Sequence, residues 1–149
     1  VWATHALYAV PESELDAALE RFVRAMDGAG FIAHASKNAH YLRFYQYYID
    51  GFKGGMGVPF SSAESIVESL NRLGVDFQVS HISYENGAPD GAKSQVEGYL
   101  QRCLFDDTIS LEAMRANPII GPYLDTCLKA GQWRFEQCVM LLFFRRANR

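Results

Sequence analysis

Apolar residues along the chain fall into short continuous runs and into longer stretches with helical spacing. Runs of strand length occur at 1–4 and 31–35, and turn residues follow or precede each of them, as is typical of buried strands. From Ser13 to Met26 the apolar residues recur at helical spacing, and acidic residues crowd the first turn, where the helix dipole favours them. The start of the chain therefore predicts a strand, a helix and a second strand.

The middle of the chain repeats this alternation. Helical spacing over 38–49 predicts a second helix, and the glycine-rich segment 51–57 ends it. Residues 61–64 read Ser-Ser-Ala-Glu, a capping-box pattern that predicts the start of a helix ending at Gly74. Alternating apolar and polar residues then predict a strand over 75–83 with one wetter face.

The last third of the chain predicts short helices and one long strand. A loop is expected at 87–91, and helices over 93–105, 110–115 and 122–130. The segment 135–145 is rich in Val, Leu and Phe, which favours a closing strand too apolar for a surface edge.

Strands that alternate with crossover helices favour an α/β fold. The connections predict a mostly parallel sheet covered on both faces, with right-handed crossovers. A length of 149 residues with 49% hydrophobic residues suits one domain over residues 1–149. The chain opens at Val1, within an apolar segment, and we therefore expect truncation or processing.

Composition excludes several classes of protein. A formal net charge of -3 without a basic stripe argues against nucleic acid as a partner. The chain has no run of about 18 apolar residues, the length that would indicate a membrane span. Three widely spaced cysteines without a CxxC pair predict neither a disulfide framework nor a metal site; packed thiols in a cytoplasmic protein are the favoured interpretation.

Polar residues just after the strands are the candidates for ligand binding, because ligands of open α/β sheets lie beyond the carboxyl ends of the strands. These positions hold Thr4, His5 and Tyr8 after the first strand and His34 at the end of the second. An imidazole there can act as a general base or orient a substrate; alternatively, both histidines only bond loop backbone. His40 is expected to be exposed on its helix.

Aromatic residues form a stripe on the second predicted helix. Tyr41, Phe44, Tyr45 and Tyr48 share one face at helical spacing, which favours a core role. The alternative is an aromatic wall of a small-molecule pocket. The glycine-rich segment 51–57 is not a phosphate-binding loop, because no strand precedes it and no Lys-Ser/Thr pair closes it.

The order of elements resembles the second half of class I S-adenosylmethionine-dependent methyltransferases. The segment 1–12, an apolar strand followed by Leu-Tyr-Ala-Val-Pro-Glu, looks like the fourth strand of that family and its following turn. The segment 70–77 and the strand beginning Phe135-Glu136-Gln137 look closest to the histamine N-methyltransferase-like branch. The resemblance covers the whole chain.

The resemblance implies a Rossmann-like three-layer sandwich whose last strand inserts antiparallel beside its neighbour. It also implies an enzyme that transfers a methyl group from S-adenosylmethionine to a small molecule. Thr4 and His5 match positions beside the cofactor, with His5 as the candidate catalytic residue. Tyr8 matches a substrate-pocket position, and Gln137 matches a polar substrate-binding residue that is asparagine in the histamine-type enzymes.

His34, Tyr41 and Tyr45 join the expected substrate-binding set on position alone. The family's glycine-rich turn and its ribose-binding acidic residue belong to a first half that these 149 residues do not contain. Residues 1–149 are therefore expected to be the C-terminal half of a methyltransferase-like domain. The alternative is an inactive ligand-binding or assembly module that completes its sheet by association, either as a homo-oligomer or with a missing N-terminal half.

Overall fold

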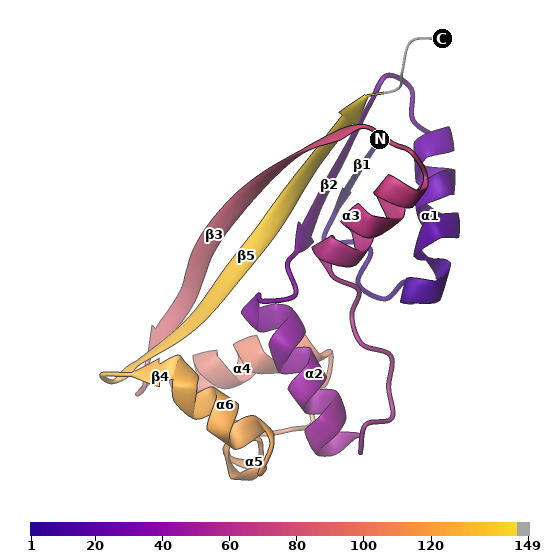
Figure 1. Cartoon of the computed structure of the whole chain (residues 1–149). Helices are drawn as coiled ribbons and strands as arrows, with labels where there is room; N and C mark the ends of the chain where they lie inside the picture. The colour runs from indigo at the N-terminus through magenta and orange to yellow at the C-terminus, as the bar shows by residue number, and fades with distance from the viewer. Residues whose placement is uncertain (146–149) are drawn as a thin grey trace. The chain divides into compact units, whose positions relative to one another are not determined.

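The computed structural model describes residues 1–145. Figure 1 shows its elements, which are β1 (Trp2–Thr4), α1 (Glu12–Arg24), β2 (Ala29–Ala35), α2 (His40–Phe52), α3 (Ala63–Arg72), β3 (Phe77–Pro89), α4 (Lys93–Leu104), α5 (Leu111–Ala116), α6 (Ile120–Cys127), β4 (Leu128–Lys129) and β5 (Gln132–Arg145). They divide into two compact units. The first comprises 1–39, 58–83 and the described residues from 138 onward, and the second comprises 40–57 and 84–137. The assignment of residues 1–149 to a single domain stays a prediction.

The strands described within residues 1–145 form a five-stranded sheet in the order β1-β2-β5-β3, with β4 paired to β5. Strand β1 runs parallel to β2, whereas β2 and β4 each run antiparallel to β5. The closing strand is therefore inserted antiparallel beside β2, as the resemblance implies, and it is not an edge strand. The prediction of a mostly parallel sheet was wrong, because β5 returns from a hairpin rather than from a crossover helix. The architecture is the expected mixed α/β, Rossmann-like one.

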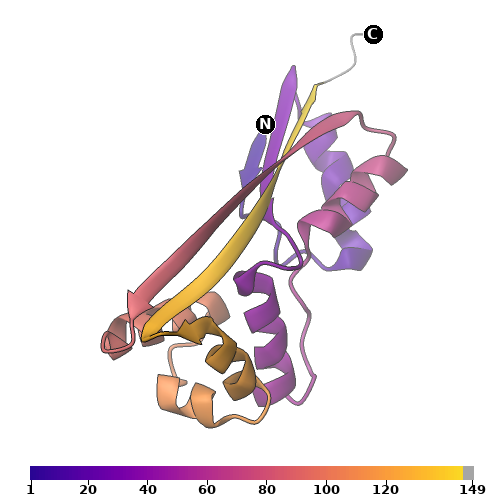
Figure 2. The ribbon, with the colours of Figure 1, turned by 60° about the vertical axis from the view of Figure 1, so that its left-hand side comes forward.

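Helices α1 and α3 build the core of the first unit. They lie on the same side of β1 and β2 in both views (Figure 1) (Figure 2). Apolar residues at helical spacing face the sheet and are buried there together with alternate strand residues: Leu15, Leu19, Ile66, Leu70, Ala3, Ile32, Leu142 and Phe144. Burial of this stripe, rather than helix propensity, holds the short helices in place.

The start of α3 differs in detail from the predicted capping box. Ser62, not Ser61, is the N-cap, and its side chain accepts a hydrogen bond from the Ser65 backbone N–H at 3.2 Å. The Ser61 hydroxyl instead donates to the Leu7 carbonyl at 2.7 Å. Glu64 is consequently free to bind another segment of the unit.

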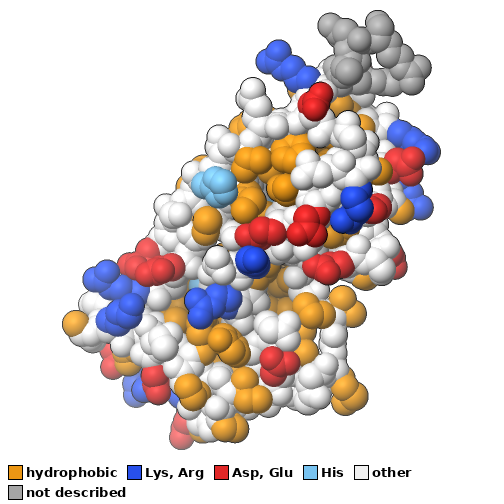
Figure 3. Space-filling view, viewed as in Figure 1, with side chains coloured by type: hydrophobic (Ala, Val, Ile, Leu, Met, Phe, Trp, Pro, Cys, Tyr) orange, Lys and Arg blue, Asp and Glu red, His pale blue; other side chains and the backbone are white. Residues whose placement is uncertain are grey.

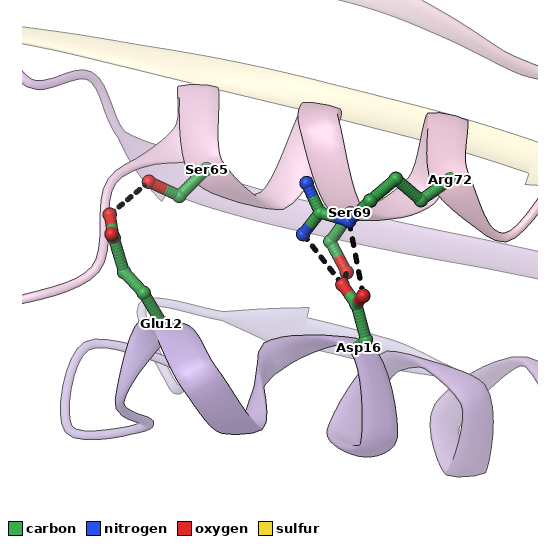
Figure 4. Close-up of polar contacts among 5 residues, drawn as sticks. All are labelled: Glu12, Asp16, Ser65, Ser69 and Arg72. Carbon is green, nitrogen blue, oxygen red and sulfur yellow. Dashed lines mark hydrogen bonds and ion pairs between the residues drawn. The ribbon is translucent and has the colours of Figure 1, made fainter.

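A polar seam joins α1 to α3 along their outer edge (Figure 4). The Asp16 carboxylate accepts hydrogen bonds from Ser69 and from the Arg72 guanidinium, whose two contacts measure 2.7 and 3.0 Å. One turn away, Ser65 donates to Glu12 at 2.5 Å. The hydrogen bonds from Arg72 and Ser69 lower the pKa of Asp16 to about 2. The seam adds polar contacts between the exposed sides of two helices whose apolar faces pack in the core.

The second unit buries aromatic and aliphatic side chains among α2, α4, α5, α6 and the adjoining parts of β3 and β5. Its fully buried members include Phe44, Leu100, Met114, Ile120, Leu124, Trp133 and Phe135. The Trp133 indole donates to Asp90 at 3.1 Å, so the one polar atom of this side chain is satisfied.

Several predicted boundaries were wrong in the second half of the chain. The helix expected over 122–130 ends at Cys127, and the chain then forms β4 and a tight turn in which Ala130 and Gly131 both adopt positive φ. Strand β3 extends to Pro89, through the predicted loop, and His81 on it is exposed. His40 is buried, not exposed as expected, because aromatic rings of its unit surround it.

Candidate functional site

In the first unit, the end of β1 brings His5 against Tyr8. The two side chains meet through a hydrogen bond of 2.5 Å between His5 Nδ1 and the Tyr8 hydroxyl. His5 adopts a φ of 51°, which non-glycine residues rarely do, while its backbone N–H continues the strand pairing by donating to the Ala33 carbonyl at 2.9 Å. Partial burial lowers the pKa of His5, so its imidazole is neutral near pH 7.

Tyr8 connects this histidine to the end of β2. Its ring lies 4.0 Å from the ring of His34 between centroids, and its hydroxyl accepts a hydrogen bond from the Ala35 N–H at 3.3 Å. Tyr8 is 8% exposed and His34 is fully buried. The carboxyl ends of two adjacent parallel strands therefore place His5, Tyr8 and His34 in one cluster.

His34 has a defined tautomer and a lowered pKa. Its Nε2 lies 2.9 Å from the Ser61 carbonyl oxygen, and because a carbonyl only accepts, Nε2 carries the proton. Its Nδ1 is buried without a hydrogen-bond partner among the described residues. Burial lowers the pKa of His34 to about 4, although the bond to Ser61 opposes this change. His34 is thus a neutral, packed group beneath Tyr8.

The loop after β2 is held by Glu64 from the first turn of α3. The carboxylate accepts hydrogen bonds from the Ser36 hydroxyl at 2.5 Å and from the Lys37 N–H at 2.8 Å. Burial favours the neutral acid, but these bonds outweigh it and lower the pKa of Glu64. A carboxylate assigned by pattern to capping its own helix therefore fixes the loop beside the histidine cluster.

Of the four residues predicted at the strand ends, the structure brings together His5, Tyr8 and His34. Thr4 is the last residue of β1, lies opposite Ala33 and is exposed. By strand alternation its side chain lies on the sheet face of Trp2, opposite the face of His34. His5, Tyr8 and His34 form the candidate site of the first unit, and the cofactor-binding role of Thr4 stays a prediction.

The other predicted residues lie in the second unit. The Gln137 side chain is buried, where its Oε1 accepts a hydrogen bond from the Tyr41 N–H at 3.4 Å and its Nε2 donates to the Tyr99 hydroxyl at 2.9 Å. Tyr41 and Tyr45 are partly buried and pack against the aromatic core. Burial raises the pKa of Tyr41 to about 12. These contacts match the core interpretation of the tyrosine stripe, and a substrate-binding role stays a prediction.

Sequence reasoning missed a second histidine cluster in this unit. His40 Nδ1 lies 2.7 Å from the Tyr123 hydroxyl, and the imidazole stacks on the rings of Phe44 and Tyr99. Burial lowers the pKa of His40 to about 3. Tyr123 follows His40 by 83 residues, so local spacing held no signal for the pair.

A cavity of about 610 Å³ lies at the other end of β2, between its first residues and the end of β5. Gly30, Asp76, Phe77, Phe143 and Arg145 are among the residues that line it. It contains none of the predicted site residues, and strand-end geometry favours the histidine cluster instead.

Membrane-spanning helices and metal-binding clusters are both absent from residues 1–145. Every helix in that range is too short or too polar to span a lipid bilayer. No group of three or more His, Cys, Asp or Glu side chains is arranged to hold a metal ion in that part of the chain. Cys103 and Cys127 are buried thiols, and burial raises the pKa of Cys103 to about 11.

Comparison with known proteins defines the fold more closely than the chemistry. No family model matches the sequence, and no curated protein matches it. The solved structure of a candidate methyltransferase from Bacillus halodurans C-125 superposes with a TM-score of 0.53 and 12% identity, over 99% of this chain and 64% of that chain. This chain thus spans less than two thirds of that neighbour.

The superposition supports a class I methyltransferase-like fold. In this chain β5 lies between β2 and β3 and runs antiparallel to β2. At 12% identity the likeness concerns the fold alone. The histamine N-methyltransferase branch is not distinguished by it.

Proposed function

We propose that this chain is the substrate-binding C-terminal half of an S-adenosylmethionine-dependent methyltransferase that acts on a small molecule in the cytoplasm. The observation that carries the proposal is the position of the cluster. His5, Tyr8 and His34 meet at the carboxyl ends of two adjacent parallel strands, where open α/β sheets bind their ligands. The methyltransferase-like fold gives that position its chemical context.

The residues at the end of β1 suit part of such a ligand. Thr4 and His5 are exposed and offer a hydroxyl and a neutral imidazole, so they fit hydrogen-bonding atoms of S-adenosylmethionine rather than a charged group. When bound, that cofactor supplies an electrophilic methyl group. Catalysis then rests largely on proximity and alignment, and the packed ring of Tyr8 holds His5 in place for this purpose.

Isothermal titration of the intact gene product with S-adenosylmethionine tests the proposal. Heat of binding is expected for the unaltered protein and for His81→Ala, a matched control on an exposed strand position. Substituting Thr4→Val is expected to weaken binding. If the intact gene product binds no S-adenosylmethionine at millimolar concentration, the proposal is wrong.

A second candidate function is assembly, and one surface of the first unit favours it. Helices α1 and α3 cover one face of the sheet, while on the other face Trp2, Phe31 and Phe143 lie side by side in register. Trp2 is 81% exposed and Phe143 is 46% exposed. Strand β1 also ends the strand order, which leaves a sheet edge open to pairing.

Exposed aromatic rows of this kind mark surfaces that associate with other polypeptide. Further hydrophobic side chains gather between acidic and basic ones on the face shown in Figure 3. On this view the chain is an inactive ligand-binding or assembly module that pairs with another copy or with a separate N-terminal half. Sedimentation of the dilute chain tests it: association that weakens on Trp2→Ser supports the module, and a stable, dilute monomer contradicts it.

A further inference from the structure

In the first unit, Ala35 and His5 contact the hydroxyl of Tyr8, and His34 packs against its ring. The Ala35 backbone N–H donates to its oxygen at 3.3 Å, and His5 Nδ1 lies 2.5 Å from the same oxygen. The ring beneath the hydroxyl rests on His34 at 4.0 Å. The position of the phenol is therefore set from two sides, by backbone and by packing.

Counting protons assigns the direction of the bond between His5 and Tyr8. A backbone N–H can only donate, so the phenol oxygen already accepts one hydrogen bond from Ala35. A phenol carries one hydrogen of its own, and His5 Nδ1 at 2.5 Å can accept it in a hydrogen bond. In this direction the phenol oxygen accepts a hydrogen bond from Ala35 and donates one to His5 Nδ1.

The opposite direction is less favourable on the same contacts. If His5 Nδ1–H donated, the phenol oxygen would accept hydrogen bonds from both His5 and Ala35, and its own hydrogen would turn away from the 2.5 Å contact with His5. The neighbouring ring of His34 does not favour that arrangement. His34 is neutral and donates its own proton to the Ser61 carbonyl, so it places no positive charge beside His5.

The backbone holds the histidine in this arrangement. His5 adopts a φ of 51°, a left-handed conformation that costs energy for a non-glycine residue. Its N–H bonds Ala33 in the strand pairing, and its side chain bonds Tyr8 three residues later. Such over-determined backbone conformations concentrate where a side chain must be presented in one orientation.

We infer that Tyr8 fixes the neutral imidazole of His5 in the tautomer that carries its proton on Nε2, so that His5 presents a hydrogen-bond donor to an oxygen atom of the bound ligand. Tyr8 is then a positioning residue. The role of His5 toward the ligand rests on the proposed function and deepens it. His5 orients a carbonyl, carboxylate or hydroxyl oxygen of the ligand and does not serve as the general base. No proton leaves the acceptor through His5.

Nitrogen-15 NMR of the intact gene product with labelled histidine measures the tautomer directly. The four histidines are assigned by single substitutions. For His5 a pyrrole-like Nε2 and a pyridine-like Nδ1 are expected, in contrast to the averaged nitrogens of the exposed His81. A pyrrole-like Nδ1 on His5, or averaged nitrogens, would overturn the inference.

Substituting Tyr8→Phe keeps the ring over His34 and removes the hydroxyl. The two nitrogens of His5 are then expected to move toward averaged positions, whereas Tyr84→Phe, at a 46% exposed tyrosine, leaves them unchanged. If His5 keeps its tautomer in Tyr8→Phe, the phenol does not set it and the positioning role fails. Should Tyr8→Phe not fold, the measurement on the unaltered protein still decides the tautomer.

The role of His5 toward the ligand is tested by two variants, of which one keeps an N–H donor and the other has no polar group. His5→Gln keeps an N–H donor and is expected to retain more methyl transfer than His5→Leu, which has none. Equal losses in both, with a flattened pH profile, would assign His5 to base catalysis and overturn the donor role. If the unaltered protein shows no methyl transfer, the proposed function fails while the NMR result on the tautomer stands independently.

Discussion

Each of the two units buries a histidine beside a tyrosine, but the surroundings of the pairs differ. In the first unit His34 lies under Tyr8, and Tyr8 in turn bonds His5, which is exposed at the end of a strand. In the second unit His40 bonds Tyr123, and aromatic rings on α2, α4 and β5 enclose it.

The difference shows that a buried imidazole can belong either to a functional site or to a hydrophobic core. Both histidines have strongly lowered pKa values, and each has one ring nitrogen without a partner among the described residues. A perturbed pKa therefore does not distinguish a site from a core. Solvent access distinguishes them, because among the described residues only the first cluster includes an exposed side chain that is hydrogen-bonded to its tyrosine, that of His5.

The largest expected effect tests whether the aromatic stripe on α2 is core. Phe44 is fully buried, so Phe44→Ala should lower the free energy of unfolding by about 3–5 kcal/mol. Urea denaturation measures this loss. Phe143→Ala, at a 46% exposed ring, is the matched control and should cost much less. Equal losses at the two positions would contradict the assignment.

A smaller loss is expected when the enclosed histidine of the second unit is removed. His40→Leu leaves the buried Tyr123 hydroxyl without its imidazole partner, which should cost about 1–3 kcal/mol in urea denaturation. His81→Leu, at an exposed strand position, serves as the control and should be nearly neutral. An unchanged midpoint for His40→Leu would show that the hydrogen bond does not support the core.

The pH dependence of stability should reveal both buried histidines. Their folded pKa values, about 4 for His34 and about 3 for His40, lie below the ordinary value of 6.5. The unfolded chain then binds more protons, so stability is fully present above pH 6.5 and declines as the pH falls toward those values. Unfolding at pH 7 and pH 5 should show the decline, and His34→Leu should reduce its slope. A slope that His34→Leu leaves intact would assign the decline to other groups.

The smallest effect concerns the polar seam between α1 and α3. Asp16→Asn removes the carboxylate that Arg72 and Ser69 bind, but the pair is exposed and solvent screens it, so only a slight loss of stability is expected. The contribution of Asp16 is present above pH 3.8 and is lost as the pH falls through about 2. Thermal melts at pH 6 and pH 2.5 check this: Asp16→Asn should differ from the unaltered protein less at the lower pH. A large loss at pH 6 would mean that the seam, not the apolar core, holds α1 to α3.

Local pattern predicted the elements of the first unit well, and its failures have physical causes. The apolar stripes through Leu15 and Ile66 gave α1 and α3, because burial on one helix face is a local signal. The direction of β5 came only from the resemblance, since pairing between residues about 110 apart leaves no local trace.

The place of the candidate site could be predicted from the sequence, but the hydrogen bonds and ring contacts that join its residues could not. Strand ends located His5, Tyr8 and His34, yet the bonds that join them depend on tertiary contacts. Glu64 fitted a capping box and instead binds the loop after β2, because Ser62 took over the cap. His40 seemed exposed by helical spacing, but rings from distant segments enclose it.

Mapping S-adenosylmethionine onto the intact gene product by NMR tests the central claim most directly. Chemical-shift changes are expected at Thr4, His5 and Tyr8, the side chains at the end of β1, while His40 and Tyr123 keep their resonances. If no chemical shifts change at millimolar cofactor, or if the changes centre on His40 and Tyr123, the result contradicts a methyltransferase site at the strand ends of the first unit.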